Sequence, residues 1–399
     1  MLVIGLIKEG KVPHDNRVAL TPPQCEWLLK TIPESRILVQ PSPIRCFSDA
    51  DYMEAGAEIQ TDLSPCNLLF GIKEVPVQEL IPAKTYLFFS HTRKMQPYNR
   101  ELMHAMIDKK ITLIDYECLE HEDGQRIIGF GFFAGVVGAH NGMMAYGKRT
   151  GTYTLNRVYR ARDYRELIHT YFGLKLPSIK IAVTGSGRVA HGILEVMNLM
   201  DVQDVEPEDF LSRNFSYPVY VHLKGSNLYQ HKRTGKYNRE DFHRHPEAYA
   251  CLFEPYCWHT DILMNGIFWD RKMAPLFSMN TIRNNNFRIQ TIADITDDLK
   301  GSVPCNLGDA TMDNPVYGVN KESGEKTEPY LEGSIDVMAV GNLPNELPRD
   351  ASRFFGEQLI KYVLSDFIRG GSEILEKATI LKNGELTPGF RYLADYALH

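Results

Sequence analysis

The stretch SIKIAVTGSGRVAHGILEVMNLM, residues 178–200, decides the fold of this chain. An apolar run of strand length leads into a glycine-rich turn, and apolar residues then recur at helical spacing. Gly185, Gly187 and Ala190 form the pattern GxGxxA. In that pattern the first glycine permits a tight turn, the second lets the backbone approach a pyrophosphate, and the small third residue lets helix and strand pack closely. The stretch therefore predicts a dinucleotide site at a helix N-terminus, against the alternative of an ordinary strand–helix turn.

The same turn supplies two further candidates for cofactor binding, Arg188 and Val189. Arg188 either meets a phosphate or is a solvated residue of the first helical turn. A carboxylate for the adenosine ribose usually follows about 20 residues after the glycines. Asp201, Asp204 and Glu206 lie in this range, but the segment DVQDVEPEDF is a poor strand, so the choice between NAD and NADP stays open at this point.

A lysine at the end of another expected strand bears on the same choice. Lys224 follows VYVHL (219–223), and its charge would neutralise a 2′-phosphate if this segment lies beside the adenosine. We therefore expect NAD(P)H as the cofactor, with NADP slightly favoured over NAD.

Strands and helices alternate along the rest of the chain. The expected strands of the first half are continuous apolar runs, as in parallel strands buried on both faces: 2–7, 36–40, 67–72, 85–91 and 111–117. Helical spacing predicts a helix over 98–110. The later part of the chain has further expected strands and a helix, namely 179–183, 261–269, 288–295 and 334–340, then 350–369. This alternation predicts the α/β class with doubly wound parallel sheets.

Composition excludes several classes of protein. The 399 residues include 44 Lys and Arg against 50 Asp and Glu, a net charge of −6, so the chain lacks the basic surplus that nucleic-acid binding needs. The longest apolar stretch, 130–139, is about half the roughly 20 residues of a membrane-spanning helix. Seven scattered cysteines without a CxxC pair indicate reduced thiols and no metal site. Together with an N-terminus that lacks a leader pattern, they predict a cytoplasmic protein.

Four segments, most of them at expected strand ends, resemble one family. GIKEVP (71–76), FFSHTRK (88–94), LIDYE (113–117) and FGFFAG (130–135) are similar to the lysine-forming saccharopine dehydrogenases, above all to the lysine–ketoglutarate reductase half of the bifunctional lysine-degrading enzymes. The wider superfamily includes alanine dehydrogenase and transhydrogenase. The resemblance continues in order over nearly the whole chain, for example in VGNLPNELPRDASRFFG (340–356).

This resemblance implies a fold and a reaction. The fold has two doubly wound, Rossmann-like parallel-sheet domains with the active site in the cleft between them: a discontinuous substrate domain, 1–135 plus 320–399, and a dinucleotide-binding domain, 136–319. The implied reaction is the reductive condensation of L-lysine with 2-oxoglutarate to saccharopine, or its reverse, with NAD(P)(H). Because the chain stops at His399, we expect the separate saccharopine-oxidising half of the bifunctional enzymes to be absent.

The resemblance also assigns a catalytic pair. Lys73 and His91 each follow an apolar strand, at the strand end where open α/β sheets place ligands. Reduction of an imine needs groups that exchange protons near neutral pH. Histidine does so unaided, and lysine does so once burial or positive neighbours lower its pKa. The family pattern places its two acid–base residues at these positions.

Further residues are expected on the substrate side. Arg17, Lys94 and Arg126 are candidates to hold substrate carboxylates, a role that suits guanidinium groups in particular. Glu74 and Glu117 are expected to tune the catalytic pair or to hold a substrate amine.

Cofactor contacts are expected from the later strands as well. Asn265 ends an apolar strand and would lie beside the nicotinamide. Asp294 or Asp297, and Thr311 or Asp313, follow the next strands and are expected to contact the ribose or the substrate.

Two rival functions share many of these features. An alanine dehydrogenase or an opine-type amino-acid dehydrogenase would have the same fold and a Lys/His pair, but would act on another amine and keto acid. A non-catalytic NAD(P)-binding protein would need the fold alone, and the joint presence of Lys73, His91 and Arg17 argues against it. In the enzymatic readings the partners are a small amino acid and a keto acid, without nucleic acid or membrane, and the sequence does not indicate the oligomeric state.

Overall fold

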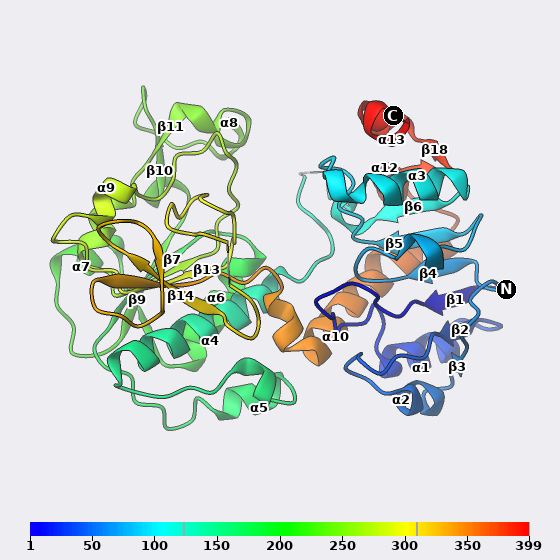
Figure 1. Ribbon diagram of the computed structural model, residues 1–399, viewed down its shortest axis with the longest axis horizontal. Coiled ribbons are helices and arrows are strands. Elements are labelled where there is room, and N and C mark those ends of the chain that lie inside the picture. Colours follow the sequence, from blue (N-terminus) through cyan, green and yellow to red (C-terminus); the bar gives the residue numbers. More distant parts are fainter. Residues whose placement is uncertain (123, 309, 399) are drawn as a thin grey trace. The chain divides into compact units, whose positions relative to one another are not determined.

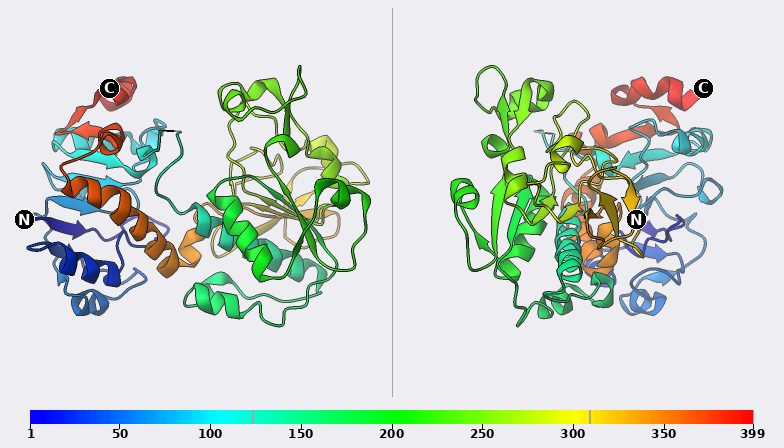
Figure 2. Two further views of the ribbon diagram at one scale, coloured as in Figure 1. Left: turned by 180° about the vertical axis from the view of Figure 1, so that it is seen from behind. Right: turned by 60° about the vertical axis from the view of Figure 1, so that its left-hand side comes forward.

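The computed structural model describes residues 1–122, 124–308 and 310–398, which form two compact units, each built around one sheet (Figures 1 and 2). The first unit comprises Met1–Phe130 and Pro348–His399, and the second comprises Gly131–Leu347. The first boundary lies five residues before the expected one. The second boundary differs more: residues 320–347, expected in the substrate domain, belong to the second unit, because their strands pair in its sheet.

The sheet of the first unit has eight strands in the order β18-β17-β6-β5-β4-β1-β2-β3. Their bounds are β1 (Val3–Leu6), β2 (Arg36–Val39), β3 (Glu58–Ile59), β4 (Leu68–Phe70), β5 (Thr85–Phe88), β6 (Thr112–Asp115), β17 (Thr379–Lys382) and β18 (Glu385–Leu386). From β6 to β3 all neighbours are parallel, whereas β17 and β18 form an antiparallel hairpin beside β6. The loops after β1, β4, β5 and β6 therefore leave the sheet at one common edge.

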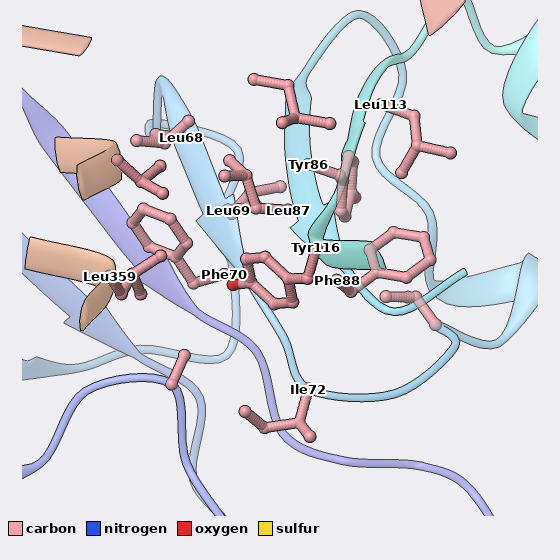
Figure 3. Close-up of a cluster of buried hydrophobic side chains, with 14 of the residues drawn as sticks. Leu68, Leu69, Phe70, Ile72, Tyr86, Leu87, Phe88, Leu113, Tyr116 and Leu359 are labelled. Atoms are coloured by element: carbon pink, nitrogen blue, oxygen red, sulfur yellow. The ribbon is translucent and has the colours of Figure 1, made fainter. Parts of the chain in front are cut away.

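The core of the first unit explains its apolar strands. Phe70 of β4, Phe88 of β5 and Leu113 of β6 are almost completely buried, and Figure 3 shows them with Tyr116 and Leu359 in one cluster. Burial on both faces is what continuous apolar strands predict. The helices of this unit are α1 (Pro22–Thr31), α2 (Asp49–Glu54), α3 (Arg100–Asp108), α10 (Pro348–Leu359), α11 (Ser365–Ile368), α12 (Glu373–Ala378) and α13 (Ala394–Leu398).

The sheet of the second unit also has eight strands, in the order β15-β14-β16-β13-β12-β7-β9-β8. Their bounds are β7 (Lys180–Thr184), β8 (Gln203–Asp204), β9 (Val219–Leu223), β12 (Ile262–Asn265), β13 (Thr291–Asp294), β14 (Val316–Asn320), β15 (Lys326–Thr327) and β16 (Ser334–Met338). The six neighbouring strands β8, β9, β7, β12, β13 and β16 are parallel, which confirms the doubly wound expectation. Each sheet ends in antiparallel strands: β14 and β15 beside β16 in this unit, and β17 and β18 in the first unit. The strands β14 and β15, like β17 and β18, are joined by only a few residues, and such neighbours can pair only antiparallel.

Helices α4 (Gly131–Thr150) and α6 (Arg188–Leu199) of the second unit pack with their backbones in contact. A Cβ atom added at Gly135 would lie 2.0 Å from the carbonyl oxygen of Val189, and one added at Gly192 would lie 2.0 Å from that of Phe132. Glycine is therefore required on both helices. The other elements are α5 (Tyr164–His169), α7 (Pro207–Ser212), α8 (Arg239–Arg244), α9 (Met279–Ile282), and the separate strand pair β10 (Tyr229–His231) and β11 (Tyr249–Cys251). None of the helices in the described part of the chain has the length and hydropathy of a membrane-spanning segment.

Candidate active site

The two residues expected to exchange protons follow neighbouring strands of the first unit. Lys73 comes after β4 and His91 after β5, and these strands pair in register, with Phe70 opposite Leu87. Both side chains are half-buried. The sheet thus brings together at one edge the two groups that the sequence placed there.

His91 is held by an ionised carboxylate. Its Nδ1 lies 2.7 Å from Oε1 of Glu74, and Lys11 donates to both oxygens of Glu74 at 2.9 and 2.8 Å. Burial acts to raise the pKa of Glu74, but the hydrogen bonds from His91 and Lys11 outweigh it and lower the pKa to about 2. His91 itself has a φ of 53°, a left-handed conformation that non-glycine residues adopt mainly at functional or tightly constrained sites. A carboxylate on Nδ1 fixes the ring and leaves Nε2 for a reactant.

Lys73 lies in an environment that disfavours its charge. Burial and the neighbouring Arg17 lower its pKa, while Asp15 and Glu74 partly offset this effect. In the described part of the chain, no hydrogen bond or ion pair engages Nζ of Lys73. The side chain therefore has a free amine whose pKa is shifted in the direction that favours proton exchange.

Arg17 occupies a buried ion pair. Its Nε donates to Oδ1 of Asp15 at 2.9 Å, its Nη2 pairs with the other oxygen, and the guanidinium stacks over Phe130 with 4.1 Å to the ring centroid. The Arg17 side chain is only 3% exposed. Burial acts to raise the pKa of Asp15, but Arg17 lowers it to about 2. The arrangement gives Arg17 an electrostatic role beside Lys73 in addition to the substrate contact that the sequence suggested.

Glu117 and Arg126 form a second charged pair at this edge. Nη2 of Arg126 lies 3.2 Å from Oε1 of Glu117. The other carboxylate oxygen, Oε2, is buried without a hydrogen-bond partner in the described structure. Arg126 is 42% exposed and keeps donors for a further anion. Lys94, by contrast, is exposed, and the structure gives it no contact with either residue.

Asp115 and Asn99 tie the loops of this edge together. Asp115 accepts hydrogen bonds from the N–H of Ser90 at 3.0 Å and the N–H of Glu117 at 2.7 Å. Asn99 donates to Oε1 of Glu74 at 3.3 Å and to the carbonyl oxygen of Ser90 at 3.0 Å. Neither residue was predicted for the site, although Asp115 lies inside the motif LIDYE and could have been found from its place at a strand end.

The glycine turn of the second unit has the shape that a dinucleotide needs. Gly185 has a φ of 110°, and a Cβ atom there would lie 2.4 Å from the carbonyl oxygen of Gly266. Gly187 is the N-cap of α6, and a Cβ atom there would meet nothing within 4 Å. The N-terminus of a twelve-residue helix is a place where phosphate groups commonly bind. Arg188 and Val189 are half-buried in the first turn of this helix.

The strand beside the glycine turn is β9. The N–H of Gly185 donates to the carbonyl oxygen of Leu223 at 3.1 Å, and Nε2 of His222 lies 2.7 Å from the carbonyl oxygen of Gly185. Lys224 follows directly and is exposed. Among the residues expected to supply a carboxylate, Asp204 lies opposite Tyr220 on the edge strand β8, away from the end of β9.

Asn265 and Asp294 lie inside the second unit. Both are fully buried, and Nδ2 of Asn265 donates to Oδ1 of Asp294 at 2.7 Å. Thr184 donates to Asn265 at 2.7 Å, and Asn306 donates to Asp294 at 2.8 Å. These side chains brace the ends of β7, β12 and β13 rather than facing solvent. Asp313 is exposed on a loop, and the structure gives it no contact with the glycine turn.

Asp294 makes the stability of the protein depend on pH. Burial outweighs the hydrogen bonds from Asn306 and Asn265 and raises its pKa to about 7, whereas an unfolded aspartate titrates near about 3.9. Folding therefore takes up a proton between these values, and the contribution of Asp294 to the free energy of unfolding falls as the pH rises through this interval. Asparagine does not titrate, so we expect the free energy of unfolding of the wild type, measured relative to that of Asp294→Asn, to decrease from about pH 5 to about pH 8. Urea unfolding at both pH values measures it, and a difference that does not vary with pH would contradict the assignment.

Comparison with known proteins supports this description. Residues 5–137 match the family model "Alanine dehydrogenase/PNT, N-terminal domain". Among solved structures, an L-alanine dehydrogenase shares the fold with a TM-score of 0.66 at 17% identity, covering 99% of this chain and 100% of that chain. The transhydrogenase from Sinorhizobium meliloti gives a TM-score of 0.61 at 13% identity, over 97% of this chain and 100% of that one.

Curated relatives extend the comparison over the whole chain. The alpha-aminoadipic semialdehyde synthase of Arabidopsis thaliana is 28% identical over 98% of this chain and 41% of its own length, and the mitochondrial enzyme of Mus musculus is 28% identical over 98% and 47%. The chain thus spans less than half the length of these relatives. The saccharopine dehydrogenase [NAD(+), L-lysine-forming] of Candida glabrata is 24% identical over 87% of both chains.

These comparisons agree on the fold: the chain shares the two-unit fold of an L-alanine dehydrogenase, and its residues 5–137 match the alanine dehydrogenase/PNT family model. The Candida glabrata relative carries the cofactor NAD(+) in its name. Over most of its length the chain is similar to the alpha-aminoadipic semialdehyde synthases and to the lysine-forming saccharopine dehydrogenases.

Proposed function

We propose that the chain catalyses the reductive condensation of L-lysine with 2-oxoglutarate to saccharopine, or the reverse reaction. The observation that carries the proposal is the pairing of Lys73 and His91 on adjacent strand ends, with Glu74 on the imidazole. The ε-amine of lysine adds to the keto carbon, water leaves, and the resulting imine takes up a hydride and a proton. A bound nicotinamide dinucleotide supplies that hydride. Gly185, Gly187 and the first turn of α6 would hold its pyrophosphate.

Lys73 and His91 move the protons in this scheme. Formation of the imine removes protons from the amine and delivers one to the departing hydroxyl, so two groups that each exist in both protonation states are needed. The lowered pKa of Lys73, caused by burial and Arg17, supports a role as a base. The hydrogen bond between Nδ1 of His91 and Oε1 of Glu74 supports a fixed orientation of His91 during the transfer.

Glu117 and Arg126 are suited to the ends of the substrates. The buried and unpartnered Oε2 of Glu117 would accept a hydrogen bond from a substrate ammonium group. The exposed guanidinium of Arg126 would pair with a substrate carboxylate. Arg17 is already paired with Asp15, so we assign it first to the electrostatics of Lys73 and second to substrate binding.

Lys224 supports NADPH as the preferred cofactor. It follows β9 beside the glycine turn, at the strand end where NAD-binding folds carry a carboxylate. We expect Lys224→Ala to raise the KM for NADPH about tenfold, the effect of losing one hydrogen bond to a charged group, and to leave the KM for NADH unchanged. Initial rates with each cofactor measure this. Lys236→Ala, at an exposed lysine of the same region, is the matched control, and equal effects of the two substitutions would count against Lys224.

One assay tests the proposed reaction directly. The oxidation of NADH and of NADPH is followed with lysine and 2-oxoglutarate together, and with each omitted in turn. Activity that requires both substrates supports the proposal. Turnover of alanine with NAD, without turnover of lysine and 2-oxoglutarate, would favour an alanine dehydrogenase. Binding of NAD(P) without turnover on any amine and keto acid would favour a non-catalytic protein.

Two further expectations accompany this proposal. A cytoplasmic location stays a prediction, and the seven cysteines, all of which are free thiols, favour it. That the substrate and dinucleotide sites meet in a cleft also stays a prediction.

A further inference from the structure

Glu9 binds the turn that carries Lys73. It lies in the loop after β1, and its Oε1 accepts a hydrogen bond from the N–H of Ile72 at 2.7 Å. Its Oε2 accepts a second hydrogen bond from the N–H of Lys73 at 2.9 Å. One carboxyl group therefore engages two successive backbone donors, directly at the residue expected to exchange protons.

The place of Glu9 in the sheet explains why these donors need it. Strands β1 and β4 pair as far as Leu6 and Phe70, and the last backbone hydrogen bond between them runs from the N–H of Ile7 to the carbonyl oxygen of Phe70 at 2.9 Å. Beyond this point β1 supplies no further carbonyl to the turn, yet Ile72 is completely buried. A buried N–H group without a partner is costly, so the Glu9 carboxyl provides the acceptor oxygens that β1 does not.

The opposite side of the same turn is held by β5. The N–H of Gly71 donates to the carbonyl oxygen of Leu87, and the N–H of Phe89 donates to that of Ile72, both at 3.0 Å. The turn is thus fixed by backbone on one side and by a single side chain on the other. Loss of the Glu9 side chain would leave the N–H groups of Ile72 and Lys73 without their acceptors, while the hydrogen bonds to β5 would remain.

We propose that Glu9 is a positioning residue that holds Lys73 in its working place through the backbone of Ile72 and Lys73. This inference rests on the proposed role of Lys73 in proton exchange. The charged groups around Glu9 are Asp15 and Arg17 from its own loop, and Tyr116 lies near it on the loop after β6. Burial and Asp15 raise the pKa of Glu9 to about 8. Near neutral pH the group is therefore largely uncharged, and it acts through its acceptor oxygens.

The variant Glu9→Gln separates geometry from charge. At neutral pH it changes little in charge, but it places an NH₂ group against one of the two backbone N–H donors and loses that hydrogen bond. We expect kcat with lysine, 2-oxoglutarate and NADPH to fall about tenfold or more, as small misplacements of a reacting group do. We expect the KM values to change less than about threefold, since no substrate contact is removed.

A second measurement reports on Lys73 without relying on activity. Acetylation of Lys73 by acetic anhydride is followed by mass spectrometry over a range of pH, and its midpoint gives the pKa of the amine. Because burial contributes most to the low pKa of Lys73, a released turn exposes the amine, and we expect the midpoint to rise in Glu9→Gln. Glu58→Gln, which removes an exposed carboxylate paired with Arg36 on a neighbouring strand, is the control and should leave the midpoint unchanged.

The outcomes decide between the possibilities. A wild-type protein inactive on lysine and 2-oxoglutarate refutes the proposed reaction, while the labelling midpoints still test Glu9. An unchanged midpoint in Glu9→Gln overturns the positioning role, even if kcat falls. If Glu9→Gln does not fold, Glu9→Asp replaces it: this variant keeps both oxygens but withdraws them by one methylene group, and the same shift in midpoint is expected.

Discussion

Lys73→Met is expected to lower kcat by about 10²–10⁴-fold, the usual cost of removing a general acid or base. Methionine keeps the length and apolar stem of the side chain but exchanges no proton, so the half-buried site stays filled. The limb of the pH profile that reports the Lys73 amine should disappear. Steady-state kinetics over a range of pH, with lysine and 2-oxoglutarate, measures both effects.

Lys110→Met is the matched control for this substitution. Lys110 is an exposed lysine that precedes β6, at the start of a strand and not at the strand ends that carry the candidate site, and its replacement removes the same charge. We expect kcat to change less than about threefold, since surface charges are strongly screened. A normal kcat and pH profile in Lys73→Met would show that Lys73 is not the base, and Glu117 would then be the next candidate.

Gly187→Leu is expected to weaken dinucleotide binding by about 100-fold or more while leaving the fold intact. A Cβ atom at this position meets no other atom within 4 Å, so the free protein accommodates the side chain. A leucine would instead fill the space in which a pyrophosphate approaches the N-terminus of α6. Calorimetric titration with NADPH and NADH measures the affinity, and thermal unfolding measures the fold.

Gly185→Ala, in contrast to Gly187→Leu, is expected to destabilise the fold itself. Its Cβ atom would lie 2.4 Å from the carbonyl oxygen of Gly266, at a φ of 110° that alanine adopts with strain. We expect the free energy of unfolding to drop by more than about 1 kcal/mol.

Unchanged dinucleotide affinity in Gly187→Leu would show that the glycine turn does not bind the dinucleotide.

The parallel strands could be predicted because burial on both faces leaves a plain signal. Runs such as those around Phe70 and Phe88 fit only a buried strand, and Lys73 and His91 follow their ends. The choice of these two residues as an acid–base pair came from the family resemblance and stays a prediction. The antiparallel edges had no such signal. Short strands such as β15 and β18 have two residues each, and their pairing depends on tight turns rather than on apolar periodicity.

The partners of the site residues were harder to predict. Lys11, Asn99 and Glu9 reach Glu74 and Lys73 from other loops, and periodicity does not encode the path of a loop. The residue that contacts the adenosine ribose could not be predicted for a similar reason. The expected carboxylate was sought about 20 residues after the glycines, whereas an additional edge strand and helix separate the glycine turn from β9 and Lys224.

The discontinuity of the first unit fixes an order in which the protein can be completed during synthesis. The second unit is one continuous segment, 131–347, and all its strands have been synthesised before residue 348 is added. The sheet of the first unit must wait, because β17 pairs with β6, and Phe355, which packs on Phe89 and Tyr116, is made late. The nascent chain therefore carries an open strand edge and an uncovered aromatic cluster for the time needed to translate more than two hundred residues. Such exposed edges are the surfaces that chaperones protect and that aggregate without them.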